Sequence, residues 1–430
     1  MADIISRNGE EITIQFKLKL SGSMLEMEQA IQIGINEAGC VATKEALTKF
    51  DSTGAPIQIG SIKMTSKGKV KKEYETPYGT VEIERHVYQT AKGGKVFCPL
   101  DDKARIVIHS TPKFAKMITY KYASLSAKDV SCDLEENHSR HVARGFIQNL
   151  TDYVGAIAES TEQQWDYELP EQREPVKIIS VSLDGTCILM KDEGYREAMT
   201  GNITLYGDSG ERLHTIYVGA APEYGKALFL KRLQNEVDKI KKKYPKVKYV
   251  GIADGAASNW PFLEANTKYH IIDFYHVSEY LTEASHAFFS NEVERKNWLS
   301  EACHRLKHED DGALNLLNQM KKRSNKIAND KKITKLARDG LNAAIKYFSN
   351  QLARMNYSEY RRKNFPIGSG VTEAACKTLI KQRLCKSAMQ WKNQGAKVVI
   401  SLRALVQTTG RWTQFWKMID QHGVNSYATA

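Results

Sequence analysis

The stretch VKIISVSLDGTCILM, residues 176–190, decides the fold class of this chain. Its apolar residues form a short run up to Asp184, and such a run predicts a buried strand over 176–183. Gly185 follows directly, and a glycine lets the backbone turn sharply away, which leaves the carboxylate at the rim of the sheet. We therefore expect a sheet whose first strand ends at an acidic residue.

The segments after this strand predict the rest of the sheet. Extended runs and helices alternate in a fixed order: strands at 203–206 and 214–218, a helix at 226–243, a strand at 249–253 that ends at Asp254, a short helix, and a strand at 269–272 that leads to Asp273. Three strands, then a helix, a strand, a helix and a strand, are the layout of an RNase H-like mixed sheet flanked by helices. The expected fold class is therefore α/β with this sheet, joined to an all-helical insertion and a mixed α+β N-terminal region.

Composition and periodicity divide the chain into regions, and residues 168–175, with two prolines, are the best linker candidate. Tyr78-Gly79 predicts a turn between two strands, and Ser126 or Ser131 is expected to cap a helix. The expected regions are an N-terminal helix and β-hairpin region at 1–110; a helical region at 111–167, compatible with a helix-turn-helix DNA reader; the first part of the RNase H-like core at 176–280; a helical insertion at 281–362; and the final core helix with basic C-terminal helices at 363–430.

The charge balance favours a polyanionic partner. Lysine and arginine total 62, against 50 aspartates and glutamates, which gives a formal net charge of +12. In a chain without a membrane span, nucleic acid is the first candidate. No stretch approaches the roughly 18 unbroken apolar residues that a span needs, and the N-terminus has no signal-peptide core. The seven cysteines are scattered and never form a CxxC pair, as is usual for reduced thiols. The expected location is cytoplasmic and nucleoid-associated.

A third acid joins the two aspartates in the pattern. Glu373 lies in NFPIGSGVTEAACKTLIKQRL, residues 364–384, just after a Gly-Ser-Gly turn that can begin a helix. Phosphodiester cleavage uses two Mg²⁺ (or Mn²⁺) ions about 4 Å apart, which take carboxylate ligands. The 70 residues between Asp184 and Asp254 fit the intervening strands and helix. The 119 residues between Asp254 and Glu373 require an insertion, and the helical block before Glu373 accounts for it.

Each acid also has a structural explanation. An Asp-Gly pair after a strand is often only a turn, and a glutamate in the first turn of a helix stabilises the helix dipole. Acids at strand ends would also suit a glycosidase, but the basic charge of the chain argues against that enzyme class. Because the three acids occur together in this order of elements, we interpret them as metal ligands.

Four segments resemble those of bacterial insertion-sequence DDE transposases, most closely the Kra-type family: VSLDGT (181–186), IADGAASNW (252–260), DFYHVSEYL (273–281) and GSGVTEAACKTLIKQRL (368–384). The resemblance covers roughly residues 177–391. It implies that Asp184, Asp254 and Glu373 form the catalytic, metal-binding triad of a DNA transposase that excises and joins transposon ends. It also implies that Asp273 and His276, an Asp-x-x-His pair, lie near the active site. The alternative for His276 is a residue that caps or packs at a strand–helix junction.

The resemblance also implies a homodimer or a larger assembly on DNA.

Relatives often carry paired cysteines near the N-terminal hairpin, which suggests a small zinc module. Here only Cys98 follows that hairpin. A set made of Cys98, Cys132, His138 and His141 would match the spacing of no standard finger, so the sequence does not predict zinc.

A one-sided basic run follows Glu373. Lys377 and Lys381 are at helical spacing from it and should share its face. Between residues 374 and 419 there is no acid, and there are nine basic residues: Lys377, Lys381, Arg383, Lys386, Lys392, Lys397, Arg403, Arg411 and Lys417. Such a run predicts a track for DNA phosphates beside the metal site. The expected DNA contacts are Lys377, Lys381, Arg383, Lys386 and Trp391, whose ring could stack on bases or pack in the core.

Two other functions stay open at this stage. A stand-alone RNase H-like nuclease would share the metal site but would need neither a helical insertion nor a separate N-terminal reader. A catalytically silent, transposase-derived DNA-binding protein would be favoured by loss of one of the three acids, and all three are present.

Overall fold

The computed structural model describes residues 2–162, 164–223 and 225–424 of the chain. Its contacts separate two compact units. Unit 1 contains residues 1–167, 397–406 and 410–430, and unit 2 contains residues 168–396 and 407–409. The first division lies at the start of the proline-containing stretch 168–175. Residues 397–406 and 410–430 are grouped with unit 1, whereas the sequence placed all of 363–430 with the core sheet.

Unit 1 begins with a hairpin and a long helix. Strands β1 (Ala2–Asn8) and β2 (Glu11–Phe16) pair antiparallel. Helix α1 (Met24–Thr48) begins with a capping box, in which the Ser23 hydroxyl accepts from the Glu26 amide and the Glu26 carboxylate accepts from the Ser23 amide. This reciprocal pair satisfies two backbone donors that a helix start otherwise leaves open.

An antiparallel sheet with the order β3-β4-β5-β6 follows. Thr76 closes the turn between β4 and β5, because its amide and its hydroxyl both donate to the Gly79 carbonyl. The turn predicted at Tyr78-Gly79 is thus confirmed. The strands are β3 (Ile57–Ile59), β4 (Ile62–Glu75), β5 (Thr80–Thr90) and β6 (Gly93–Phe97).

Helices complete unit 1. Ser126 caps α4 through the Asp129 amide, as predicted, whereas the Ser131 hydroxyl donates to the Val142 carbonyl. The helices are α2 (Pro99–Lys103), α3 (Pro112–Tyr122), α4 (Ala127–His138), α5 (Arg144–Thr161), the greater part of α15 (Asn393–Gln407), and α16 (Arg411–His422).

The central sheet of unit 2 is mixed, with the order β11-β10-β7-β8-β9. Strands β7, β8 and β9 are antiparallel neighbours, and β10 pairs in parallel with both β7 and β11. The predicted α/β class is confirmed. The strands are β7 (Ile178–Met190), β8 (Gly194–Tyr206), β9 (Arg212–Ala220), β10 (Lys248–Ala253) and β11 (Tyr269–Ile272).

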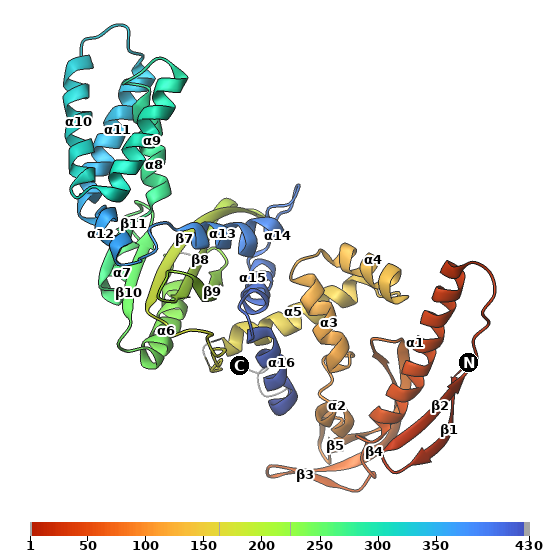
Figure 1. The fold of residues 1–430 in the computed structure, drawn as a ribbon. Coiled ribbons are helices and arrows are strands. Elements are labelled where there is room, and N and C mark those ends of the chain that lie inside the picture. Colours follow the sequence, from red (N-terminus) through yellow and green to blue (C-terminus); the bar gives the residue numbers. More distant parts are fainter. Residues whose placement is uncertain (1, 163, 224, 425–430) are drawn as a thin grey trace. The chain divides into compact units, whose positions relative to one another are not determined.

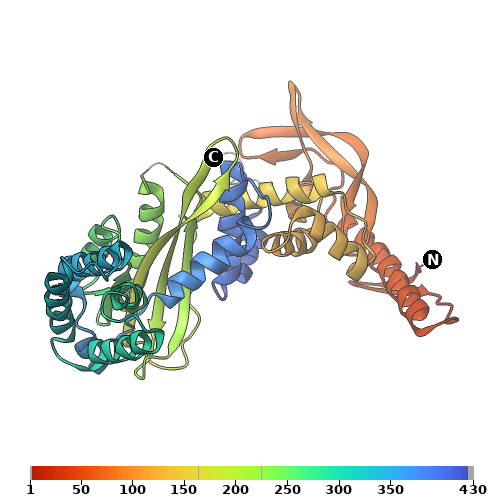
Figure 2. The same ribbon diagram turned by 90° about the horizontal axis from the view of Figure 1, so that it is seen from above.

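Strand β7 does not end at Asp184, which corrects the prediction. It continues to Met190, and Asp184 pairs with Thr200 within a long β7–β8 hairpin (Figure 2). Gly185 faces the Glu197 side chain, whose carboxylate would lie 2.2 Å from a Cβ at this position and would have to move aside for a larger residue. The Asp-Gly pair is therefore extended backbone and not a turn.

Helices cover the sheet. In α6 (Ala227–Lys243), the residues Phe229, Leu233, Val237 and Ile240 recur every three or four positions and are at most 3% exposed. One face of α6 is thus buried in the core that also holds the sheet residues. The other short helices beside the sheet are α7 (Trp260–Asn266), α13 (Gly370–Ala375), the π-helical turn η2 (Cys376–Lys381) and α14 (Gln382–Leu384).

The described residues between β11 and α13 contain helices and no strand, as the sequence predicts for the insertion. Helices α8 to α11 form a bundle beyond the end of the sheet where β10 and β11 stop (Figure 1). The helices are α8 (Phe274–Ser285), α9 (Glu292–His308), α10 (Gly312–Ile327), α11 (Lys335–Gln351), the short η1 (Leu352–Arg354) and α12 (Tyr357–Arg362).

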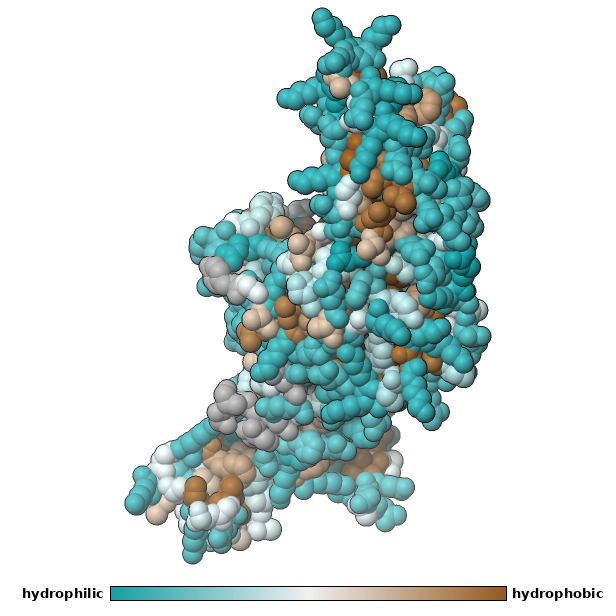
Figure 3. Space-filling view, turned by 90° about the vertical axis from the view of Figure 1, so that its left-hand side faces the viewer, coloured by the Kyte–Doolittle hydropathy of each residue, from teal (hydrophilic) through white to brown (hydrophobic). Residues whose placement is uncertain are grey.

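On the face drawn in Figure 3, hydrophilic residues predominate and hydrophobic residues gather in separate patches. Among the described residues, no helix combines the length and the apolar character needed to cross a bilayer.

Candidate functional site

The register of the sheet aligns two of the predicted acids. Paired residues of β7 and β10 differ by 70 positions, as in Ile178 with Lys248 and Ser182 with Ile252. Asp184 and Asp254 also differ by 70 positions, so they are at the same level of the two strands. Side chains at matched positions of neighbouring strands lie on the same face of a sheet. The register therefore brings the first two acids side by side.

The next strand adds a third aspartate at the same level. The last printed pair between β10 and β11 is Ala253 with Ile272, and the Asp273 amide donates to the Ala253 carbonyl at 2.9 Å. Asp254 and Asp273 are the residues that follow this pair on the two strands. Asp184, Asp254 and Asp273 thus form one row across β7, β10 and β11.

Asp184 lies in a confined, partly buried place. One carboxylate oxygen accepts from the Gly185 amide at 2.7 Å, and the other faces the Cys376 thiol at 3.4 Å. Burial raises the pKa of the Asp184 carboxyl above its ordinary value, and the negative charge of Asp254 raises the pKa further. Burial and Asp184 also raise the pKa of the Cys376 thiol to about 12, so this thiol stays protonated and can donate.

Asp254 begins a tight loop. Its carboxylate accepts from the Ala256 amide at 3.0 Å and lies 3.4 Å from the side-chain amide of Asn259. Gly255 has no room for a side chain, because a Cβ would lie 2.5 Å from the Tyr347 ring. Here the glycine after the acid does allow a close approach, and Tyr347 of α11 covers the loop.

Glu373 reaches this region on α13, which packs against β7 and β8. Asn202 donates to the Thr372 hydroxyl at 2.8 Å, and Cys376 lies 3.1 Å from the Thr200 hydroxyl. These contacts fix the inner face of the helix and leave Glu373 exposed in its first turn. Burial, followed by the charge of Asp273, raises the pKa of the Glu373 carboxyl.

Asp273 has a different environment from the other acids. It is fully buried, and it begins α8 by accepting from the amides of Tyr275 and His276. Its second oxygen accepts from the amide and the hydroxyl of Ser369, the residue before α13. Both oxygens are therefore used within the fold, and Asp273 ties the start of α8 to the start of the helix that carries Glu373.

His276 is about one-third exposed and lies 3.2 Å from the Glu279 carboxylate. It also interacts electrostatically with Asp184 and Glu373, so it belongs to the same neighbourhood. The sequence did not single out Glu279 or Cys376. Helical spacing could have found both, because Glu279 follows His276 by three positions and Cys376 follows Glu373 by three.

The site carries negative charge that no lysine or arginine among the described residues neutralises through an ion pair. Within the described residues, Asp184, Asp254 and Glu373 form no ion pair with lysine or arginine, and their mutual repulsion contributes to the raised pKa values of Asp184 and Glu373. In that part of the chain, no group of three or more His, Cys, Asp or Glu side chains is arranged so that it could hold a metal ion as it stands. The donor chemistry, carboxylates without cationic partners, nevertheless fits Mg²⁺ or Mn²⁺, which prefer oxygen ligands.

The basic run divides into buried arginines and exposed lysines. Lys377, Lys381, Lys386 and Lys392 of unit 2 are exposed. The arginines Arg383, Arg403 and Arg411 are 2%, 5% and 8% exposed, respectively.

Two of the predicted DNA contacts, Arg383 and Trp391, interact with each other or with the backbone of the protein. Arg383 lies over the Trp391 ring, with 5.1 Å from the guanidinium carbon to the ring centre. The Trp391 indole donates to the Leu384 carbonyl at 2.9 Å. The Arg383 guanidinium is buried in this packing, so we do not place it in the proposed interface. Trp391 is half-buried, and the stacking of its ring on DNA bases stays a prediction.

The helix after Glu373 changes its winding. Residues Cys376–Lys381 form a π-helical turn, and such turns often occur at functional sites. The spacing from which Lys377 and Lys381 were predicted assumed an α-helix. Both side chains are exposed all the same, on the helix that begins beside the acids.

No family model matches the chain, and no curated protein matches it. Similarity to a characterised protein therefore does not identify the site, and its function is inferred from its own geometry and chemistry.

The raised pKa of Asp184 leads to a prediction about stability. A carboxyl with a raised pKa in the folded state stabilises the fold below its ordinary pKa of 3.8, and this stabilisation is lost as the pH rises through the raised value. In a chelating buffer at neutral pH, Asp184→Asn should therefore have a higher melting temperature than the wild type. The difference should shrink as the pH falls towards 3.8 in thermal unfolding measured across this range.

The same experiment with Mg²⁺ provides the control. A divalent cation that binds only the folded state should raise the melting temperature of the wild type and have less effect on the variant. If the two proteins melted together at every pH, Asp184 would not lie in an uncompensated acidic site.

Proposed function

We propose that this protein is a DDE-type DNA transposase that cuts DNA at insertion-sequence ends and transfers the cut strands. The observation that carries the proposal is the juxtaposition of Asp184 and Asp254, aligned by the sheet register, with Glu373, brought to them by α13. Asp184 and Asp254 are 70 residues apart in the chain, and Asp254 and Glu373 are 119 residues apart.

The order of the sheet supports an RNase H-like core for this function. An antiparallel series, β7 to β9, is extended on the β7 side by the parallel strands β10 and β11. This is the sheet that the sequence predicts for an RNase H-like fold. The helical insertion α8–α12 lies between the second and third acids, where the resemblance to Kra-type transposases requires it.

In the proposed mechanism, Asp184, Asp254 and Glu373 would hold two Mg²⁺ (or Mn²⁺) ions. When bound, such ions supply Lewis acidity to the attacking and leaving oxygens of an in-line phosphoryl displacement. Asp273 holds the start of the helix that carries Glu373. His276, about one-third exposed and close to the acids and Glu279, can contact a DNA phosphate. The exposed lysines that follow Glu373 provide positive charge for the DNA backbone.

The partners in this proposal are transposon ends and target DNA, bound by a homodimer or a larger assembly. A stand-alone nuclease is the first alternative, and the insertion together with unit 1 argues against it because a simple nuclease needs neither. A silent DNA-binding derivative is the second alternative. The uncompensated acids argue against it, because they repel one another and a protein without catalysis gains nothing from keeping them.

Cleavage and strand transfer in Mg²⁺ test the proposal, with DNA that carries the sequences flanking the gene. Wild type is compared with Glu373→Gln and with Glu292→Gln, a matched control that changes another exposed first-turn glutamate on α9. We expect nicking and joining by the wild type and by the control, and neither by Glu373→Gln.

The three outcomes are distinct. Binding to the flanks without cleavage by any of the proteins would favour the silent derivative. Cleavage without joining would favour the nuclease. Neither binding nor cleavage would overturn DNA as the substrate.

A further inference from the structure

A polar cavity of about 540 Å³ lies where helix α9 meets α12 at the base of the insertion. Its polar lining is basic or neutral, and no acid takes part. It is lined by Ser300, Cys303, His304, Lys307, His308, Arg361 and Ile367.

The cations of this cavity are not neutralised by acids. Within the described residues, Lys307 and Arg361 form no ion pair with a carboxylate. The Lys307 ammonium lies over the Phe274 ring, 4.3 Å from its centre. The Arg361 guanidinium lies 2.7 Å from His308 Nε2. Burial, followed by the positive charge of Arg361, lowers the pKa of the His308 imidazole, and an imidazole carries no negative charge that would cancel the guanidinium.

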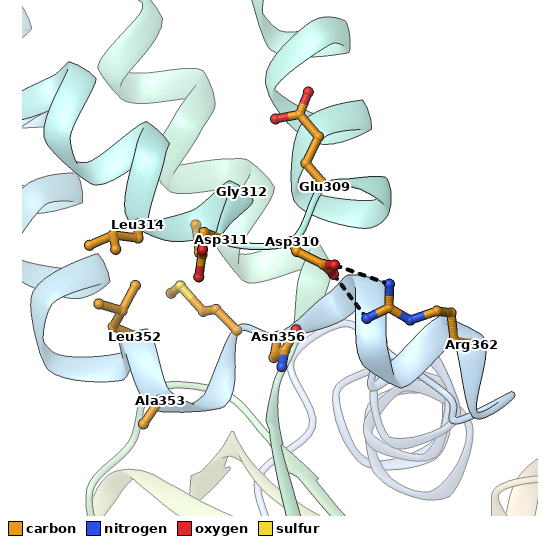
Figure 4. Close-up of a pocket in the computed structure, with 11 residues that line it drawn as sticks. Glu309, Asp310, Asp311, Gly312, Leu314, Leu352, Ala353, Asn356 and Arg362 are labelled. Atoms are coloured by element: carbon orange, nitrogen blue, oxygen red, sulfur yellow. Dashed lines mark hydrogen bonds and ion pairs between the residues drawn. The ribbon is translucent and has the colours of Figure 1, made fainter.

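Two acids of the loop after α9, Glu309 and Asp310, have partners outside this cavity. Asp310 is bridged to Arg362 at 2.9 Å in an adjoining cavity (Figure 4) and accepts from Ser358 at 2.7 Å. Glu309 pairs with Arg305 at 3.2 Å. The loop after α9 thus keeps its carboxylates in a separate cavity, and the basic cavity remains positive.

The basic cavity and the acidic site share a wall. Ile367 lines the cavity, and its carbonyl accepts from the Phe274 amide at 3.0 Å. Phe274 directly follows Asp273, which in turn holds Ser369. Two short segments, 273–274 and 367–369, therefore separate the cavity from the acids.

Helix stabilisation explains only part of this arrangement. Basic residues in the last turn of α9 stabilise its dipole, which accounts for Lys307 and His308. The last turn of α12 likewise contains Arg361, so each helix dipole accounts for its own basic residues but not for the convergence of basic side chains from two helices on one cavity. Unneutralised donors of this kind, lysine and arginine with imidazoles between them, are the groups that bind phosphate.

We propose that the cavity formed by His304, Lys307, His308 and Arg361 binds a backbone phosphate of the DNA strand that passes the acidic site. This inference rests on the proposed function, since it takes DNA as the substrate. It assigns a DNA contact to the helical insertion, where the sequence predicted only a spacer between the second and third acids.

The test compares Lys307→Gln/Arg361→Gln with a matched control, Lys321→Gln/Lys322→Gln, which removes the same charge from the exposed face of α10 in the same insertion. DNA affinity is measured over a range of KCl concentrations. Each phosphate contact contributes about 0.9 to the slope of log K against log salt. We expect the slope of the cavity variant to be smaller in magnitude than that of the wild type by about 0.9, the contribution of one phosphate contact. The control should keep the wild-type slope. Melting temperatures verify that both variants are folded.

Equal slopes for wild type and the cavity variant would overturn the inference while leaving the proposed function intact. If the wild type bound no DNA, the proposed function would fail. Titration of the wild type and the cavity variant with inorganic phosphate would then decide whether the cavity binds an anion. A shift of the His308 imidazole resonances in the wild type, absent in the variant, would support an anion site. No shift would overturn it.

Discussion

Asp184→Asn is expected to lower the rate of DNA cleavage by about a thousandfold or more, the scale that follows removal of a central catalytic group. Asparagine keeps the shape of the side chain and can still accept from the Gly185 amide. It removes the negative charge that a divalent cation needs beside Asp254. Affinity for DNA should be unchanged or slightly higher, because one negative charge leaves the binding surface.

Asp192→Asn is the matched control, because it makes the same change in the exposed turn between β7 and β8. The measurement is the single-turnover cleavage rate in Mg²⁺, together with the dissociation constant for the same DNA. Cleavage by Asp184→Asn at a rate within tenfold of the control would exclude Asp184 from the metal-binding set.

Asp273→Ala is expected to have the second largest effect, and it should act on both stability and activity. Its buried carboxylate accepts from three backbone amides and one hydroxyl, and hydrogen bonds to a charged group contribute about 1.5 to 3 kcal/mol each. We expect the free energy of unfolding to fall by about 3 kcal/mol or more. Cleavage should fall about 10- to 100-fold, as when a residue that orients metal ligands is lost.

A purely structural role would not change the requirement for the metal ion. The distinguishing measurement is the Mg²⁺ concentration that gives half of the maximal rate, which should rise if Asp273 positions Glu373. Asn291→Ala removes a different helix cap, that of α9, and should cost about 1 kcal/mol without moving this concentration. If Asp273→Ala does not fold, Ser369→Ala removes one of the same hydrogen bonds and replaces it in the test. An unchanged Mg²⁺ requirement in the folded variant would limit Asp273 to helix capping.

Local signals in the sequence were enough for several elements. The apolar spacing of Phe229, Leu233 and Val237 predicted α6, because a helix with one buried face repeats its apolar positions every three to four residues. Ser126 predicted the start of α4, since a cap depends only on residues a few positions away. The row of acids also began as a sequence observation, because each aspartate follows an apolar run. In these cases the physical cause lies within one turn or one strand.

Long-range packing decided what the sequence could not. Strand β7 continues past Asp184 because β8 pairs with it up to Met190, and this pairing depends on residues after the turn. Arg383 was predicted to bind DNA from its charge and position, yet it lies buried against Trp391. Whether a charged side chain faces solvent depends on which segments pack around it.

By itself, the sequence determined the mixed α/β class, the helical insertion, and the presence of the acids with a basic run after the third. The tertiary structure decided which of these residues meet. It aligned Asp184 with Asp254 through the register of parallel strands, and it gave Asp273 a buried, hydrogen-bonded place that holds Ser369 before Glu373. The reason is that register and burial arise from contacts between residues far apart in the chain, whereas periodicity and capping are properties of short segments.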